Sequence, residues 1–430
     1  MLQLLERQTI AELVALNSAI ATEPGSVATR LASFLANSSG VTLALQGPPG
    51  TGKSTVTGQV IAQLVADGKR VAISSNSHAA INNLLIKAHT TCQKQGLGER
   101  VVKCSSSKKE EVLAREGIPL VHPDEITEEE AVVGGTAWMF CREELADQFD
   151  LLVIDEAGQM SLANLLVMAR CAKSILLVGD QQQLAQPSQA DHPGDSGRSC
   201  LEYLMQGAHV VPDDRGVFLA TSWRMEPSLT AMVSQLFYDG RLKANPANAV
   251  NAISWRQSCL AATGEPLPTQ GLVFEPVAHS GCSVVSEAEI DRIEQIVDAL
   301  LNGSYCHARA GGEKRGVLGP EQILVTAPYN VQVNRLQQCL GKRARVGTVD
   351  KFQGQEAPVA IHSLTASDGD AAPRGLGFLL EPNRLNVAIS RAQCLSIVVG
   401  SPGLTTGIAN TVEEAEQINR LCRITQSATT

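Results

Sequence analysis

The chain has 430 residues, of which 44% are hydrophobic, 18% charged and 3% aromatic, and its formal net charge is −9. This apolar content is enough for a sizeable core and excludes a wholly disordered chain, while at about 150 residues per domain the length suggests about three domains. The negative charge excludes a uniformly basic nucleic-acid-binding surface but permits a local basic channel. The scarcity of aromatic residues argues against an extended stacking surface.

No apolar run reaches the roughly 18 residues that a membrane span needs. The N-terminus carries Glu6 and Glu12 in place of the continuous apolar core of a signal peptide. We therefore expect a cytoplasmic protein with no membrane association. The eleven cysteines form no CxxC pair, which excludes zinc ribbons and iron–sulfur clusters and predicts reduced thiols.

Short apolar runs alternate with helix-length stretches along the whole chain. In the first half the runs cover residues 41–46, 70–75, 151–154 and 174–178, and in the second half 323–327, 345–349, 359–364 and 395–399. This alternation predicts an α/β fold with mainly parallel sheets and helices on both faces. Two tandem domains are the simplest interpretation, over residues 1–215 and 216–430. The polar segments 88–130 and 242–269 fit neither sheet, and we expect them to be surface insertions.

A glycine-rich loop follows the first apolar run directly and matches G-x-x-x-x-G-K-[ST]. It consists of Gly47, Pro48, Pro49, Gly50, Thr51, Gly52, Lys53 and Ser54, followed by Thr55. Glycines let backbone N–H groups point at phosphate oxygens, and the helix that follows adds its positive N-terminal end. Lys53 supplies a cation for the outer phosphates, and Ser54 supplies a hydroxyl for Mg²⁺.

The run at residues 151–154 ends in two carboxylates, Asp155 and Glu156. Asp155 is suited to holding Mg²⁺ and Glu156 to accepting a proton from an attacking water. A strand that stops at acidic residues is a weak signal alone, but it becomes strong downstream of a phosphate loop. The pair predicts hydrolysis of a nucleoside triphosphate, and the absence of G-x-G-x-x-G argues against dinucleotide binding.

Later segments narrow the class of enzyme. They occupy residues 179–184 (GDQQQL), 221–227 (TSWRMEP), 328–332 (PYNVQ), 346–356 (VGTVDKFQGQE) and 383–392 (NRLNVAISRA). In this order they resemble the motifs of superfamily 1 helicases, in the branch of the nonsense-mediated-decay helicase and its DNA-acting relatives. With residues 75–78 (SNSH), 133–138 (VGGTAW), 155–159 (DEAGQ), 214–219 (DRGVFL) and 390–394 (SRAQC), the chain is most similar to the helicase half of bacterial RecB-like nuclease–helicase fusions. The resemblance covers residues 40–424.

The resemblance implies two tandem RecA-like P-loop domains with ATP and Mg²⁺ between them. The first domain would supply Lys53, Glu156 and Gln183. The second would supply Arg224 and Arg391 as arginine fingers, with Glu356 near the ribose. Guanidinium groups stabilise the charge that phosphoryl transfer builds, and a cleft that closes only around the γ-phosphate makes a motor.

The same resemblance places single-stranded nucleic acid, with DNA favoured over RNA, on a second set of residues. The set is Asn76, His78, Thr136, Trp138, Tyr329, Gln332, Thr348 and Lys351. Hydroxyls, amides and a lysine suit phosphate contacts, and the two aromatic rings suit stacking. Core packing of Trp138 is an equally good interpretation, and a local hydrogen-bonding role is the stronger one for His78.

The chain departs from the family pattern upstream of the phosphate loop. Only 46 residues precede Gly47, which is too few for the accessory β-barrel of the relatives. Gln8 is the candidate adenine-reading residue. No carboxylate cluster resembles the nuclease site of the fused relatives, so we expect the nuclease on a partner polypeptide or on a missing N-terminal part.

The predicted function is that of an ATP-dependent helicase or translocase acting on DNA in repair or recombination. The residues leave three alternatives. RNA is the alternative substrate, and an ATP-switched clamp for nucleic acid or a nuclease partner is the alternative class. A small-molecule kinase fits poorly, because it has no use for a second domain that carries Glu356 and Arg391.

Overall fold

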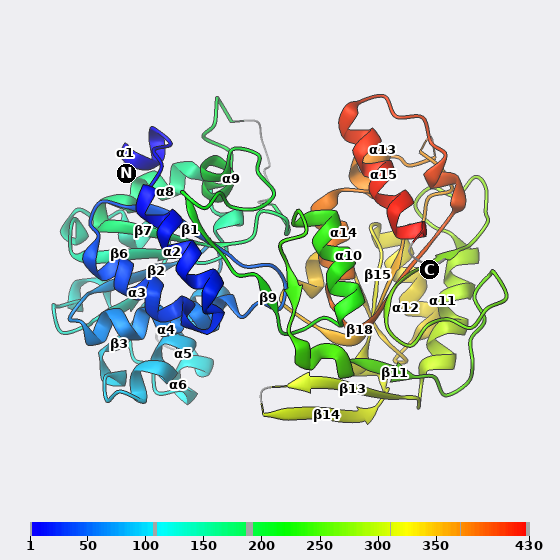
Figure 1. Ribbon diagram of the computed structural model, residues 1–430, viewed down its shortest axis with the longest axis horizontal. Helices are drawn as coiled ribbons and strands as arrows, with labels where there is room; N and C mark the ends of the chain where they lie inside the picture. The colour runs from blue at the N-terminus through cyan, green and yellow to red at the C-terminus, as the bar shows by residue number, and fades with distance from the viewer. Residues whose placement is uncertain (1, 106–109, 186–191, 310, 370, 427–430) are drawn as a thin grey trace. The chain divides into compact units, whose positions relative to one another are not determined.

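The computed structural model describes residues 2–105, 110–185, 192–309, 311–369 and 371–426 (Figure 1). The chain divides into two compact units. The first comprises Met1–Pro48, Gly52–Gln181 and Ala185–Leu219, and the second comprises Pro49–Thr51, Gln182–Leu184 and Ala220–Thr430. The main division thus falls after Leu219, not after residue 215, because strand β8 (Gly216–Phe218) pairs with the first strand of the first unit.

The first unit is built on a parallel sheet of eight strands in the order β4-β3-β5-β2-β6-β7-β1-β8. Besides β8, its strands are β1 (Thr42–Gln46), β2 (Val71–Ser74), β3 (Val101–Cys104), β4 (Leu120–Val121), β5 (Val132–Gly134), β6 (Phe149–Ile154) and β7 (Ala172–Gly179). The central strands are short and rich in Val, Ile and Leu, the composition of strands that are covered on both faces. Every predicted apolar run of the first half forms one of these strands.

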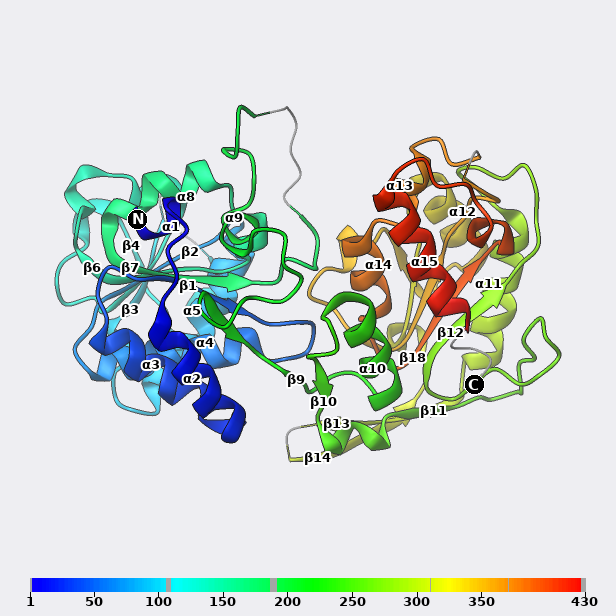
Figure 2. The ribbon, with the colours of Figure 1, turned by 45° about the horizontal axis from the view of Figure 1, so that its top comes forward.

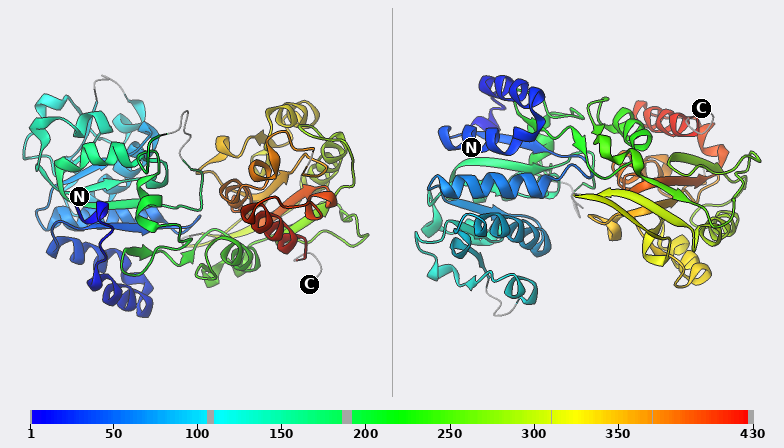
Figure 3. Two further views of the ribbon diagram at one scale, coloured as in Figure 1. Left: turned by 90° about the horizontal axis from the view of Figure 1, so that it is seen from above. Right: turned by 60° about the horizontal axis from the view of Figure 1, so that its bottom comes forward.

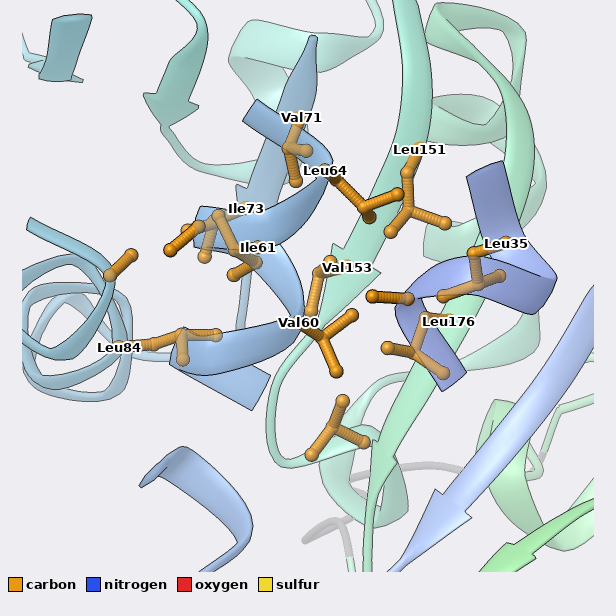
Figure 4. Packing of buried hydrophobic residues seen from close by; sticks show 14 of the residues in the cluster. Leu35, Val60, Ile61, Leu64, Val71, Ile73, Leu84, Leu151, Val153 and Leu176 are labelled. Carbon is orange, nitrogen blue, oxygen red and sulfur yellow. The ribbon is translucent and has the colours of Figure 1, made fainter. Parts of the chain in front are cut away.

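Helices cover both faces of this sheet (Figures 1 and 2). One face carries α2 (Ala11–Thr22), α3 (Val27–Asn37), α4 (Lys53–Ala66) and α5 (His78–Gln93), and the other carries α7 (Ala137–Phe140), α8 (Leu162–Met168) and α9 (Cys200–Met205). Two short helices, α1 (Leu2–Leu5) and α6 (Glu111–Arg115), complete the unit. Val60 of α4 packs toward Val153 of β6, and Leu64 of α4 packs toward Leu151 of the same strand (Figure 4). Each such buried side chain stabilises the fold by about 1.5–3 kcal/mol.

The sequence predicted that the segment 88–130 is a surface insertion, and this prediction is wrong. The segment contains the end of α5 together with β3 and β4, and β3 pairs with β5 inside the main sheet. Strand β3 is only four residues long and one of them is Lys103, so its apolar residues form no run that stands out from the polar residues around them. Residues 106–109 of this segment lie outside the described part of the chain.

The second unit is built on a parallel sheet of five strands in the order β12-β18-β17-β15-β16. These are β12 (Gly271–Pro276), β15 (Ile323–Thr326), β16 (Arg345–Gly347), β17 (Ala357–Ser363) and β18 (Ala392–Gly400). Helices α11 (Glu287–Leu300) and α12 (Asn330–Leu340) cover one face, and α10 (Pro227–Phe237), α14 (Pro382–Ile389) and α15 (Val412–Gln426) cover the other (Figure 3). Helix α13 (Gly375–Leu379) contacts α15.

Two small sheets complete the second unit. Strands β11 (Ala252–Ser254), β13 (Ser304–Arg309) and β14 (Gly312–Val317) form an antiparallel sheet, and β9 (Thr221–Ser222) pairs with β10 (Lys243–Ala244). The segment 242–269 thus contributes β10 and β11 and stays outside the five-stranded sheet. Across the described residues, every helix is too short or too polar to span a bilayer.

Candidate nucleotide and nucleic-acid sites

The glycine-rich loop connects β1 to α4 at the carboxyl edge of the first sheet. The N–H of Gly47 donates to the carbonyl of Gly179 at 3.0 Å, which fixes the start of the loop against β7. Gly50 and Gly52 have φ values of +76° and +79°, a region that residues with a Cβ rarely adopt. Helix α4 therefore starts at Lys53 with its free N–H groups facing the loop, an arrangement that binds phosphate.

Lys53 and Ser54 occupy the first turn of α4. The Lys53 ammonium donates to the carbonyl of Gly47, so the side chain lies across its own loop. Ser54 is half-buried beside it. A cation held in this position is suited to binding the outer phosphates of a nucleotide.

Two carboxylates lie at the same edge of the sheet. Strands β1, β7 and β6 are adjacent and parallel, so the loop after β1 and Asp155 after β6 share the carboxyl edge. Asp155 is buried, and its carboxylate accepts the N–H of Glu156 at 3.0 Å. Burial and the neighbouring Glu156 carboxylate raise the pKa of Asp155 to about 7, while the Lys53 ammonium acts in the opposite direction.

This site fits Mg²⁺. A buried carboxyl with a raised pKa ionises readily once a divalent cation binds, and Mg²⁺ is commonly held by one carboxylate, a hydroxyl and the phosphates of its substrate. Asp155 carries a carboxylate and Ser54 a hydroxyl of the kind that would hold the ion. Glu156 has a φ of +52°, unusual for a residue with a side chain, and such strained backbone is concentrated at functional sites.

Gln183 and Gln8 were the other candidates for this region. Gln183 follows β7 in the segment 180–184 and is buried, within the part of the chain that groups with the second unit. The Gln8 amide donates to the carboxylate of Glu6 at 2.5 Å on an exposed part of the N-terminal segment.

In the second unit, Arg224 and Glu356 form an ion pair. The Arg224 guanidinium donates to the Glu356 carboxylate at 2.6 Å and to the carbonyl of Ser390 at 3.1 Å. Gln393 donates to the other oxygen of Glu356 at 3.0 Å. Burial raises the pKa of Glu356, but Arg224 and the amide of Gln393 outweigh it and hold the pKa below its ordinary value.

Arg391 directly precedes β18, as Glu356 directly precedes β17. Because the two strands pair in parallel from Ala357 and Ala392 onward, both residues lie at the amino edge of the sheet. The Arg391 guanidinium donates to the carbonyls of Val387 at 3.0 Å and Gln355 at 3.1 Å. In this structure the predicted finger is therefore held on the backbone of its own unit.

Four predicted nucleic-acid contacts fall in the first unit, after the neighbouring strands β2 and β5. Asn76 donates to the carbonyl of Gln159 at 2.5 Å, and Thr136 directly precedes α7. Trp138 is 86% exposed, so its interpretation as a core residue is wrong. His78 is the first residue of α5 and is exposed. The structure thus brings all four to one edge of the sheet.

The other four predicted contacts fall in the second unit, after β15 and β16. Thr348 is half-buried and Lys351 is exposed. Tyr329 is nearly buried, its ring lies 5.6 Å from that of Phe378, and its hydroxyl has no hydrogen-bond partner within the described chain. Gln332 is different, because it is fully buried and its amide bonds to Ser286 and Ser363.

One residue of the first unit was missed by sequence reasoning. Lys103 is fully buried in β3, and its ammonium contacts His78. The sequence feature that could have identified it is a single lysine inside the apolar run VVKC. A lysine that is buried in a strand needs a polar partner nearby, so it indicates a polar cluster. The polar composition of the surrounding segment 88–130 masks that signal.

Comparison with known proteins gives matches along most of the chain. Two family models, each described as an AAA domain, match residues 29–193 and 196–403. The chain is 26% identical over 419 residues to "ATP-dependent helicase NAM7" of Saccharomyces cerevisiae and 28% identical over 415 residues to "Regulator of nonsense transcripts 1 homolog" of Arabidopsis thaliana. It is 28% identical over 367 residues to "DNA replication ATP-dependent helicase/nuclease DNA2" of Gallus gallus.

These three alignments cover 83%, 83% and 82% of this chain but only 40%, 31% and 34% of the relatives. The chain thus spans about a third of the length of the curated relatives it matches. Within that span, the helicase relatives and the two family models account for both units and agree with the ordered motifs. The chain belongs to the superfamily 1 helicases, with two tandem RecA-like domains.

Proposed function

We propose that this chain hydrolyses ATP to move along single-stranded nucleic acid, with DNA favoured over RNA, in repair or recombination. The observation that carries the proposal lies within the first unit. The phosphate loop and the Asp155–Glu156 pair share one sheet edge, and the predicted strand contacts after β2 and β5 follow along that same edge. In this proposal, nucleotide chemistry and strand binding use one edge of the same sheet.

The residues of the nucleotide site have distinct tasks in this proposal. Lys53 and the loop N–H groups bind and orient the phosphates, and Ser54 with Asp155 hold Mg²⁺, which neutralises phosphate charge when bound. Glu156 accepts a proton from the attacking water. Arg224 and Arg391 are proposed to stabilise charge on the outer phosphate, which requires each guanidinium to exchange its present partners for phosphate oxygens.

The choice of DNA over RNA rests on the similarity to nuclease–helicase fusions. Among the relatives, one is named a DNA replication helicase/nuclease and another a regulator of nonsense transcripts. A helicase that acts in DNA processing also explains the expected nuclease partner. The two substrates differ in the 2′-hydroxyl, which an RNA-specific site must contact.

The test is the rate of ATP hydrolysis with single-stranded DNA, duplex DNA and RNA of the same sequence. The proposal expects strong stimulation by single-stranded DNA and weaker stimulation by the other two. Equal or greater stimulation by RNA would overturn the DNA assignment. ATP turnover that none of the three changes would overturn the proposed coupling.

The alternative class, an ATP-switched clamp, needs a separate measurement. A motor displaces a labelled strand, or streptavidin from a biotinylated strand end, in an ATP-dependent reaction. A clamp hydrolyses ATP on the strand but leaves the end block in place. Displacement from only one of the two strand ends would also give the direction of movement, for which the family resemblance suggests 5′→3′.

A further inference from the structure

The buried lysine of β3 makes three polar contacts with residues of α5 and of the segment that follows β3. Its ammonium lies 2.7 and 2.8 Å from the two oxygens of the Glu110 carboxylate, 2.7 Å from the Asn82 carbonyl oxygen and 3.1 Å from Nδ1 of His78. Lys103 itself is fully buried, and the Glu110 side chain is 17% exposed. Asn82 also donates to Glu110 at 2.7 Å, so the three partners form one connected cluster.

The contacts determine which groups donate. A lysine ammonium has three hydrogens and no lone pair, and this one has three partner side chains within hydrogen-bond distance, with both oxygens of Glu110 among the acceptor atoms. Burial raises the pKa of Glu110, but hydrogen bonds from Lys103 and Asn82 outweigh it and hold the pKa below its usual range. The Glu110 carboxylate therefore stays ionised beside the buried Lys103.

The consequence for His78 follows from the same count. Because Lys103 has only donors, Nδ1 of His78 must accept, which leaves the ring proton on Nε2. A proton on Nδ1 would face the ammonium directly. Nε2 has no hydrogen-bond partner within the described chain, and His78 is exposed.

The position of His78 indicates which kind of acceptor its Nε2–H group suits. His78 is the first residue of α5, whose start is fixed by the Ser77 hydroxyl accepting the N–H of Ala80 at 3.1 Å. A helix N-terminus favours anions, so an N–H donor at this point suits a phosphate oxygen of a strand. Asn76 lies two residues before it, in the turn that follows β2.

We propose that Lys103 is a positioning residue for strand binding: through its hydrogen bond to Nδ1 it fixes His78 as the neutral Nε2–H form, which donates to a backbone phosphate of the single strand. Lys103 does not touch the nucleic acid. The inference rests on the proposed function, because it concerns how one of the proposed strand contacts is positioned.

The first experiment observes the ring directly. In protein labelled with ¹⁵N-histidine, a long-range ¹H–¹⁵N spectrum distinguishes the two neutral ring forms, and His78 is assigned by the signals that vanish in His78→Asn. We expect the wild type to show only the form protonated on Nε2. Lys103→Met should convert this pattern to a mixture. A wild-type ring protonated on Nδ1, or an unchanged pattern in Lys103→Met, would overturn the inference.

The second experiment is a double-mutant cycle on binding of a labelled single-stranded DNA, followed by fluorescence anisotropy. Loss of one hydrogen bond to a charged phosphate should weaken binding by about tenfold in His78→Ala. Lys103→Met alone should weaken it by a smaller factor, set by the fraction of His78 that leaves the Nε2–H form, and should add nothing in the His78→Ala background. Equal losses in both backgrounds would show a purely structural role for Lys103 and overturn the inference.

Two controls keep the result interpretable. Lys87→Met removes one positive charge from an exposed position of α5 and should leave strand affinity nearly unchanged. If Lys103→Met fails to fold, Lys103→Met with Glu110→Gln removes both charges of the pair together and answers the same question. A wild type that binds no strand defeats the proposed function, whereas a wild type that binds normally with full affinity retained in His78→Ala defeats this inference alone.

Discussion

Lys53 provides the only side-chain cation of the phosphate loop, residues 47–54. Replacing it with Ala removes the charge that compensates the outer phosphates, while the loop glycines and α4 remain. We expect Lys53→Ala to lower ATP turnover by at least about a thousandfold. Turnover is measured by phosphate release, with Lys94→Ala, an exposed lysine after α5, as the matched control. Near-normal turnover in Lys53→Ala would refute the site.

Arg391 tests the role of the second unit. Its guanidinium bonds to carbonyls of its own unit, so Arg391→Ala has a structural cost as well as a catalytic one. We expect hydrolysis to slow by about a hundredfold or more while nucleotide affinity stays within a few-fold. Arg391→Lys, which keeps a charge but loses the planar fork, should restore stability more than rate. Melting temperature and kcat measured together separate the two effects, and a collapse of nucleotide binding with kcat intact would disprove the finger role.

At the scale of single elements, β8 shows how closely the first sheet is packed at its edge. A Cβ on Gly216 would lie 2.3 Å from the backbone oxygen of Ala44 on β1, an atom that cannot move without breaking the pairing. Gly216→Ala should therefore destabilise the first unit by about 1–3 kcal/mol. Urea unfolding measures this, with Gly25→Ala as the control, since a Cβ there meets nothing within 4 Å. Equal stability of the two variants would contradict the packing.

Strand β17 contains a histidine that predicts a pH dependence of stability. Burial lowers the pKa of His362 from 6.5 to about 4, against a smaller opposing effect of Thr326. Between pH 6.5 and 4 this histidine binds a proton in the unfolded chain but not in the folded chain. The free energy of unfolding is therefore greatest above pH 6.5 and falls toward pH 4. The loss from this group is at most about 3 kcal/mol. Chemical denaturation of the wild type and of His362→Gln between pH 7 and 4 measures it, and identical slopes would contradict the assignment.

The elements also show where sequence reasoning stops. The long apolar runs that became β6, β7 and β18 were predictable, because a fully buried parallel strand needs a continuous stretch of Val, Ile and Leu. β3 was not predictable, because pairing with β5 and the Lys103 cluster compensate for its polar residue. The antiparallel hairpin of β13 and β14 was missed as well, since five of the six residues of β14 are exposed and give it no apolar signal.

At the scale of the whole molecule, the motifs predicted where the candidate residues lie in the fold better than which contacts hold them. Residue order alone identified the phosphate loop and the acidic pair, because their chemistry demands fixed residue types at fixed spacing. The burial of Gln332 could not be predicted from the sequence, because the motif does not show whether its glutamine contacts a ligand or a buried hydrogen-bond network. For that reason Gln332 is not among the strand contacts that we propose.

Net charge provides the last prediction at this scale. A chain with a net charge of −9 repels a nucleic-acid strand overall, so binding must come from a few local cations that displace counterions. The logarithm of strand affinity should fall linearly with the logarithm of salt concentration, with a slope of about −0.7 per phosphate neutralised.

Lys351, exposed after β16, is a proposed strand contact. Lys351→Gln should make the slope shallower by about 0.7, whereas Lys314→Gln, exposed on β14, should leave it unchanged. Titrations of labelled DNA at four salt concentrations measure both slopes, and equal slopes for Lys351→Gln and the wild type would remove Lys351 from the strand site.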